Sequence, residues 1–169
     1  MTTSWPDRLI EAGALFLLVF TPLAYGTVNP WSEAVAELVI LGMALTYVIR
    51  TLRAWELRVE LPPGWLPALL FLGLVYLQAV LPGWSLDPHA TWRQALKLAA
   101  VAALFLICYN TYRTRAQAQR ALWTMIVMGT FISLFGIAQR MTWHGRLYWI
   151  GPEVSGSPFG PFVNRTHFA

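Results

Sequence analysis

Long apolar runs separated by short polar breaks dominate the pattern of this chain. The runs lie at about residues 12–32, 34–53, 64–82, 95–112 and 121–139. A helix needs about 20 apolar residues to cross the roughly 30 Å of hydrocarbon in a bilayer, and these runs approach or reach that length. Because irregular backbone cannot face lipid, each crossing is expected to be helical. The pattern therefore predicts an all-α, polytopic membrane protein with five transmembrane helices.

The expected domain organisation follows from where this pattern stops. Residues 1–139 are predicted to form one five-helix transmembrane bundle, and residues 140–169 a loop rich in glycine and proline. The final residues, 167–169, read His-Phe-Ala and look like the start of another span. We therefore expect the loop to lead into a sixth helix, and the chain to be a truncated, amino-terminal part of a larger membrane protein.

Composition supports the membrane class and removes others. Hydrophobic residues make up 57% of the 169 residues and charged residues only 12%, whereas a soluble domain carries about 25% charged residues. The lipid bilayer is therefore the first expected partner. The net charge of +4 comes with no basic run of the kind that binds nucleic acid, so that class of partner is excluded. Cys108 is the only cysteine, which rules out a disulfide framework and a thiolate metal site.

Arginines mark two of the breaks and predict an orientation. The basic residues of these breaks are Arg50, Arg53 and Arg58 after the second run, and Arg113, Arg115 and Arg120 after the fourth. The break at 27–33 holds no basic residue. Because loops rich in arginine and lysine stay in the cytoplasm, the amino terminus is predicted inside and residues 139–168 outside. Residues 24–26 would also suit signal-peptide cleavage, but Asp7 and Glu11 offset the positive start of such a signal.

Two of the breaks carry local structure signals. Residues 25–31 contain an Asn-Pro pair and are expected to form a tight turn between helices. Asp87 followed by Pro88 has the pattern of a helix start, with the carboxylate as the cap and proline in the first turn.

The loop at 140–169 holds the residues best suited to bind a ligand. Arg165 lies between Asn164 and His167, and Arg146 comes earlier in the same loop. A guanidinium can bind a diphosphate through two N–H donors and stays charged at any working pH. A contact with lipid headgroups or with a neighbouring carboxylate is the alternative for each arginine. The sequence has no Walker loop, zinc spacing, dinucleotide-binding glycines or nucleophile elbow, so it predicts no metal and no cofactor and identifies no catalytic residue.

Several segments together resemble a known family. Residues 21–31 read Thr-Pro-Leu-Ala-Tyr-Gly-Thr-Val-Asn-Pro-Trp, and residues 159–169 read Phe-Gly-Pro-Phe-Val-Asn-Arg-Thr-His-Phe-Ala. With the break around 85–88 and the Tyr-Trp pair at 148–149, they resemble the bacterial O-antigen ligase and polymerase family, the O-antigen ligase-like membrane proteins. Members more often carry a second asparagine where this chain has Thr166.

The resemblance implies a multi-pass glycosyltransferase of the bacterial inner membrane. Such enzymes transfer a glycan from an undecaprenyl-diphosphate carrier to another glycan or to a lipid A-core acceptor on the periplasmic side. They use neither a nucleotide sugar nor, as far as the family pattern goes, a metal. Arg165, with Asn164, His167 and Arg146, becomes a candidate for the diphosphate site, because fixed cations stabilise a charged leaving group. The base that activates the acceptor is expected in a later loop, so residues 1–169 alone are expected to be inactive.

Two other functions compete with this interpretation. A non-enzymatic membrane scaffold or assembly subunit of five helices remains open. Half of a transporter is disfavoured, because transporters place ionisable residues near the bilayer midplane, and the predicted spans carry no charge near their centres.

Overall fold

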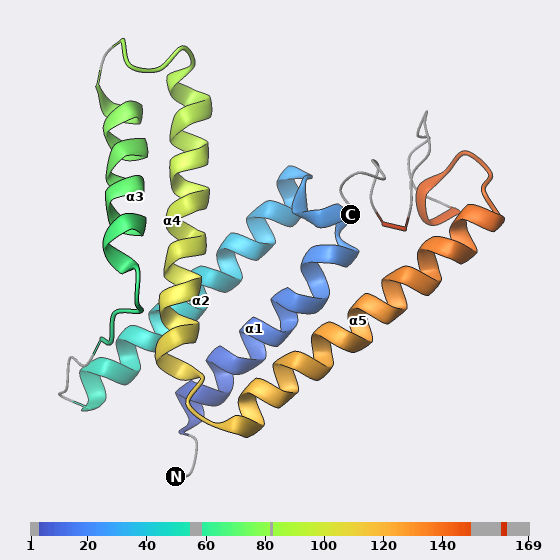
Figure 1. Cartoon of the computed structure of the whole chain (residues 1–169), viewed down its shortest axis with the longest axis horizontal. Coiled ribbons are helices and arrows are strands. Elements are labelled where there is room, and N and C mark those ends of the chain that lie inside the picture. The colour runs from blue at the N-terminus through green and yellow to red at the C-terminus, as the bar shows by residue number, and fades with distance from the viewer. Residues whose placement is uncertain (1–3, 55–58, 82, 150–159, 162–169) are drawn as a thin grey trace. The chain divides into compact units, whose positions relative to one another are not determined.

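The computed structural model describes residues 4–54, 59–81, 83–149 and 160–161, and these residues form an all-α fold without a β-sheet (Figure 1). The helices are α1 (Trp5–Leu23), α2 (Pro30–Ala54), α3 (Trp65–Val80), α4 (Pro88–Thr111) and α5 (Arg115–Met141). Single 3-10 turns lie at Tyr25–Thr27 and Leu147–Trp149. The predicted all-α class with five helices is therefore confirmed for the described part of the chain.

Three of the five helices, α2, α4 and α5, are long and apolar enough to cross a membrane. Helix α3 is apolar, but its 16 residues span only about 24 Å at 1.5 Å per residue, less than the roughly 30 Å of hydrocarbon. Helix α1 carries Asp7, Arg8 and Glu11 within its first two turns. The fold thus supports a membrane protein with three candidate spans. That α1 and α3 also cross the membrane is part of the topology proposed below.

The largest difference from the predicted spans concerns residues 12–32. The structure divides this stretch, because α1 runs from Trp5 to Leu23 and a turn follows. The helix begins early because the backbone N–H of Ser4 donates to Asp7 Oδ2 at 3.2 Å, and the Ser4 hydroxyl donates to the same atom at 2.5 Å. The helix gives way to the turn because Tyr25 and Gly26 adopt left-handed φ angles of 57° and 68°. These turn residues are uncharged, so the uncharged run extends through them, but the tight turn predicted at 25–31 from the Asn-Pro pair is confirmed.

Helices α4 and α5 also begin before the apolar runs predicted at 95–112 and 121–139. The Asp87 side chain accepts a hydrogen bond from Ala90 N at 3.0 Å, and Pro88 lies in the first turn of α4, as predicted. Thr114 caps α5 through a reciprocal pair of hydrogen bonds with Gln117. Polar residues fill these first turns because helix starts need hydrogen-bonding side chains, so a search for apolar residues alone places the helix ends too late.

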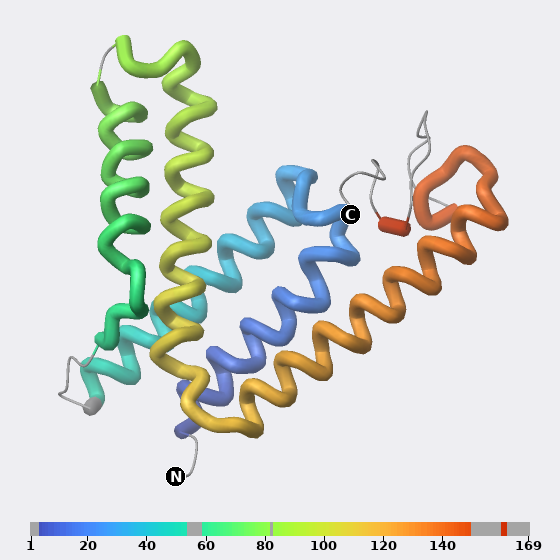
Figure 2. The backbone as a smooth tube through the Cα atoms, in the orientation of Figure 1, coloured from blue at the N-terminus to red at the C-terminus, as the bar shows by residue number. Residues whose placement is uncertain are grey.

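Two compact units are distinguished by the backbone contacts within the chain. Unit 1 comprises Met1–Gly13 and Glu37–Arg113, and unit 2 comprises Ala14–Ala36 and Thr114–Ala169. In unit 1, α3 and α4 lie side by side as an antiparallel pair (Figure 2). The Tyr76 and Trp92 rings meet edge to face across this pair, with their centroids 5.4 Å apart. Aromatic rings favour this edge-to-face geometry, so the contact helps to set the register of the two helices.

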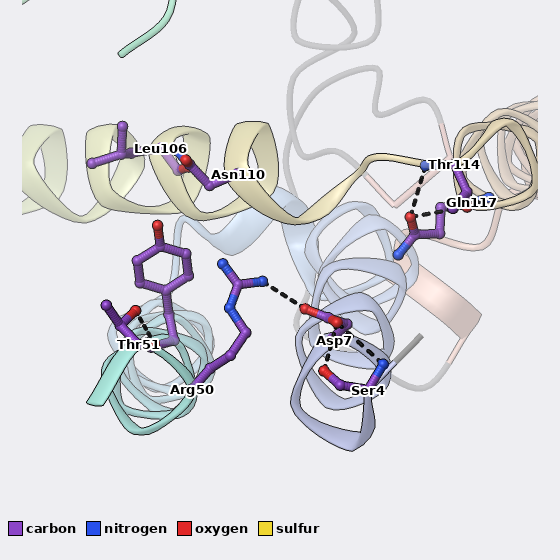
Figure 3. A network of polar contacts seen from close by, with 9 residues as sticks. Ser4, Asp7, Arg50, Thr51, Leu106, Asn110, Thr114 and Gln117 are labelled. Atoms are coloured by element: carbon purple, nitrogen blue, oxygen red, sulfur yellow. Dashed lines mark hydrogen bonds and ion pairs between the residues drawn. The ribbon is translucent and has the colours of Figure 1, made fainter. Parts of the chain in front are cut away.

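Polar contacts in unit 1 join the start of α1 to the end of α2. Arg50 Nη1 lies 2.5 Å from Asp7 Oδ1, and both side chains are about three-quarters buried (Figure 3). The Arg50 guanidinium also lies over the Tyr47 ring, 4.5 Å from its centroid. Burial raises the pKa of the Asp7 carboxyl, but the hydrogen bonds from Ser4 and Arg50 and the charge of Arg50 outweigh it, so the net pKa is lowered. The ion pair therefore persists at neutral pH.

Asn110, in the last turn of α4, holds the chain that leads into α3. Its Oδ1 accepts from Glu60 N at 2.8 Å, and its Nδ2 donates to Glu60 O at 3.0 Å and to Leu106 O at 2.9 Å. Asn110 is only 5% exposed, and its side chain takes the place of water as the hydrogen-bond partner of the Glu60 backbone. Arg113 adds a contact from the same end, with Nη1 2.8 Å from Glu60 Oε2, and this hydrogen bond raises the Arg113 pKa.

We predict that Asn110→Ala lowers the free energy of unfolding by about 1–3 kcal/mol, because the Glu60 backbone groups lose their buried partner. The matched control is Gln119→Ala, which removes a side-chain amide from an exposed position within α5. Unfolding of both variants would be followed by circular dichroism in detergent micelles. Equal stability of the two variants would show that Asn110 does not hold the segment before α3.

Candidate functional site at the end of α5

A turn in a rare backbone conformation follows α1. Tyr25, Gly26 and Thr27 all have positive φ angles, of 57°, 68° and 56°. Glycine adopts this conformation freely, whereas the two other residues bear a steric cost. Ala24 N donates to Phe20 O at 2.8 Å and Thr27 N donates to Ala24 O at 2.9 Å, so local hydrogen bonds support the turn. The conformation still requires contacts from elsewhere to be favoured.

A second turn of the same kind follows α5. Tyr148 and Trp149 have φ angles of 55° and 64°, and Gly145 before them has a φ of 83°. Trp149 N donates to Arg146 O at 3.2 Å, and the Trp149 indole N–H donates to Thr142 Oγ1 at 2.9 Å. The indole therefore ties the turn to the residue that ends α5.

Tyr148 joins the two turns within unit 2. Its hydroxyl donates a 2.5 Å hydrogen bond to Leu23 O, at the last residue of α1. Its ring meets the Tyr25 ring edge to face at 5.4 Å and lies against Phe135 of α5 at 5.1 Å. The last carbonyl groups of a helix have no partner inside the helix. The Tyr148 hydroxyl supplies that partner for α1.

Gln139 ties the two parts of the 140–161 region to each other. Its side chain is 2% exposed and lies in the last turns of α5. With the amide oriented so that both ends are satisfied, its nitrogen donates to Gly160 O at 2.9 Å and its oxygen accepts from Tyr148 N at 3.1 Å. One buried amide thereby holds the turn at 148 beside the segment at 160.

Gly160 lies directly against the backbone of α5. A methyl group at Gly160 would meet Gly136 Cα and Ile132 O at 3.6 Å, and the φ of 61° already disfavours any side chain there. Pro161 is fully buried. A methyl group would fit at these distances, so the left-handed φ, and not a lack of space, explains the glycine at 160. The chain is consequently anchored on α5 three residues before Asn164.

Only one of the predicted ligand-binding residues lies in the described part of the chain. Arg146 lies in the turn after α5, and its side chain is exposed. Arg165, Asn164 and His167 lie outside the described residues, as does the predicted start of a sixth helix. Of the four predicted residues, the structure therefore places only Arg146. In the described ranges, no group of three or more histidine, cysteine, aspartate or glutamate side chains gathers where a metal could bind.

Sequence reasoning missed the residues that frame this site. In the sequence, Gln139 is only the end of an apolar run, and Tyr148 is only half of an aromatic pair. For Gln139, the available signal is a polar residue at the end of a long apolar run. For Tyr148 there was no signal, because its hydroxyl bonds a backbone carbonyl 125 residues away in sequence.

Comparisons with known proteins add no identification to this geometry. No protein family, no curated protein and no solved structure matches the chain. The resemblance of residues 21–31 and 159–169 to O-antigen ligases therefore stands on those residues alone, and the function argued from it is a proposal.

Burial, with a smaller contribution from Tyr25, raises the pKa of Tyr148 from 10.0 to about 12. A raised pKa means that the fold favours the neutral phenol. This contribution to stability is present below the ordinary pKa of 10.0 and is lost as the pH rises through about 12. We expect the phenolate absorbance titration of the protein, minus that of Tyr148→Phe, to show one tyrosine titrating late. A difference curve centred at the ordinary tyrosine pKa would contradict the burial of the Tyr148 phenol.

Proposed function

We propose that the protein transfers a glycan from an undecaprenyl-diphosphate carrier to a saccharide or lipid acceptor, as a ligase or polymerase of the bacterial inner membrane. In this reaction the acceptor hydroxyl gives its proton to a base outside residues 1–169, its oxygen bonds to the anomeric carbon, and the bond from that carbon to the diphosphate oxygen breaks. Undecaprenyl diphosphate departs with the negative charge. Residues 1–169 supply the part that binds this diphosphate.

One structural observation carries the proposal beyond the resemblance. Three of the segments that resemble the family are linked through contacts in unit 2. The Tyr148 hydroxyl donates to Leu23 O, its ring meets Tyr25, and Gln139 bonds both Tyr148 and Gly160. The segments lie far apart in sequence, and their contacts within unit 2 support the proposal that they act together. The frame anchors Gly160 and Pro161, which immediately precede the segment with Arg165.

Arg165 is the residue proposed to bind the diphosphate. Its fork can pair with two phosphate oxygens at once, and it keeps its charge while the leaving group develops its own. Asn164 and His167 add neutral donors on either side in sequence. Arg146 has the weaker role, because an exposed guanidinium is screened by water and salt.

The proposed topology places the amino terminus in the cytoplasm, all five helices across the membrane, and residues 139–168 in the periplasm. The arginines at the end of α2, between α4 and α5 and at the start of α5 support it through the positive-inside rule. Single cysteines in a Cys108→Ser background test it in intact cells. A cysteine at 115 should resist an impermeant maleimide, and one at 144 should react. Labelling at 115 without permeabilisation would overturn the orientation.

Replacement of Arg165 tests the diphosphate role in the natural gene product. Arg165→Ala should lower transfer from undecaprenyl-diphosphate glycan by about 10²–10³, the usual loss when one preorganised donor is removed from a charged transition state. Arg165→Lys should retain part of the activity, since it keeps the charge but loses the fork. Arg146→Ala is the matched control with a smaller effect. Protein amount and membrane insertion are measured for each variant, and near-normal turnover of well-inserted Arg165→Ala would refute the role.

A further inference from the structure

An apolar groove of about 390 Å³ lies in unit 1 between α3, the turn before it and the second half of α4. The residues that line it include Pro62, Pro63, Trp65, Ala68, Ala102 and Phe105. The lining residues are aliphatic or aromatic apart from Gly64, and none is charged. A volume of this size is typical of sites that bind a small molecule or part of a lipid.

Hydrocarbon is the occupant that this lining selects. The groove runs along α4, which is one of the three candidate membrane spans, and α3 beside it carries no charged residue. A polar ligand would leave its hydrogen-bonding groups unpaired against these walls, at a cost of several kcal/mol in an apolar environment. A lipid chain meets no such cost and fills the space between the helices.

The groove ends beside a pair of opposite charges. Glu60 immediately precedes Leu61, the first residue of the wall, and Asn110 fixes its backbone through both N–H and C=O. The Glu60 carboxylate lies 2.8 Å from Arg113 Nη1. The Glu60 and Arg113 side chains are 60% and 50% exposed, so each retains faces that a ligand can approach. Trp65 at the same end is also partly exposed, as suits a residue at headgroup level.

We propose that this groove binds one acyl chain of phosphatidylethanolamine, with the headgroup paired to Arg113 and Glu60. The lipid phosphate accepts from the Arg113 guanidinium, and the ammonium donates to the Glu60 carboxylate. The site matches this headgroup because each carries one positive and one negative group next to the other. The proposal concerns unit 1 and is independent of glycan transfer by the natural protein.

The ion pair distinguishes phosphatidylethanolamine from other membrane phospholipids. Phosphatidylglycerol has the phosphate but no cation, so its headgroup would leave the Glu60 carboxylate close to a like charge. Phosphatidylcholine has a cation without N–H donors, and it cannot hydrogen-bond the carboxylate. Selectivity should be about two- to five-fold, the range that partly exposed charge pairs usually provide.

The test uses the full chain in phosphatidylcholine nanodiscs. The probe is phosphatidylethanolamine with a photoactivatable diazirine on one acyl chain, and mass spectrometry locates the label after digestion. We expect label in residues 61–72 and 98–106, and we expect unlabelled phosphatidylethanolamine to displace it better than the glycerol or choline lipid. Label spread evenly over the apolar helices, or equal displacement by all three lipids, would reduce the groove to ordinary lipid contact and overturn the proposal.

Two sets of variants separate the chain site from the headgroup site. Ala102→Phe fills the groove and should remove most of the label there, whereas Ala99→Phe adds the same ring to an exposed position of α4 outside the groove and should leave it. Glu60→Gln keeps the groove open and should transfer the preference from phosphatidylethanolamine to phosphatidylglycerol. An unchanged preference in Glu60→Gln would contradict the headgroup assignment even if Ala102→Phe failed to fold. Cross-links between two chains through a cysteine at 68 would show that a second copy covers the groove, which also excludes the lipid.

Discussion

Backbone N–H and C=O groups beyond the ends of a helix need hydrogen-bond partners. In a chain suited to a bilayer, water cannot be relied on to supply them. This requirement explains why a few buried polar side chains recur at helix ends. Asn110 pairs with both backbone groups of Glu60, Tyr148 with the carbonyl of Leu23, and Gln139 with the backbone of Tyr148 and Gly160. Each of these side chains serves backbone far away in sequence. Their hydrogen bonds fix how the non-helical segments leave the helices, and the candidate site depends on that.

The helices themselves could be predicted from the sequence, because apolar runs of helical length have few alternatives. Their ends were less predictable. Charge shows where a segment is solvated, whereas a helix ends where the backbone turns or a side chain caps it. Thus Tyr25 and Gly26 break a run without charge, and Asp87 starts α4 well before the apolar residues begin. The Asp-Pro signal was recognised in the sequence, while the equally local pair of Thr114 and Gln117 was not.

The residues of the candidate site also differ in how far the sequence could predict them. Residue types and a family resemblance could nominate Arg165 and its neighbours, because a diphosphate demands a guanidinium or a similar cation. They could not identify Gln139 or Tyr148, whose importance comes from tertiary contacts. A glutamine in a membrane helix and a tyrosine in a loop can each have many ordinary structural roles. Only the 2.9–3.1 Å bonds of one amide to Gly160 and Tyr148 give that glutamine a specific task.

Backbone strain points to the same place by a separate argument. Among the described residues, the non-glycine residues with positive φ are Tyr25, Thr27, Tyr148 and Trp149, and all belong to the two turns joined by the Tyr148 hydroxyl. Each such residue costs about 1–3 kcal/mol unless neighbouring contacts favour its conformation. The ring contact between Tyr25 and Tyr148 and the hydrogen bond to Leu23 offset part of that cost. A connecting loop needs no such arrangement, since a looser turn would link the same helices without strain. Two strained turns that support each other, with Gly160 anchored beside them, therefore form one fixed frame at the end of α5.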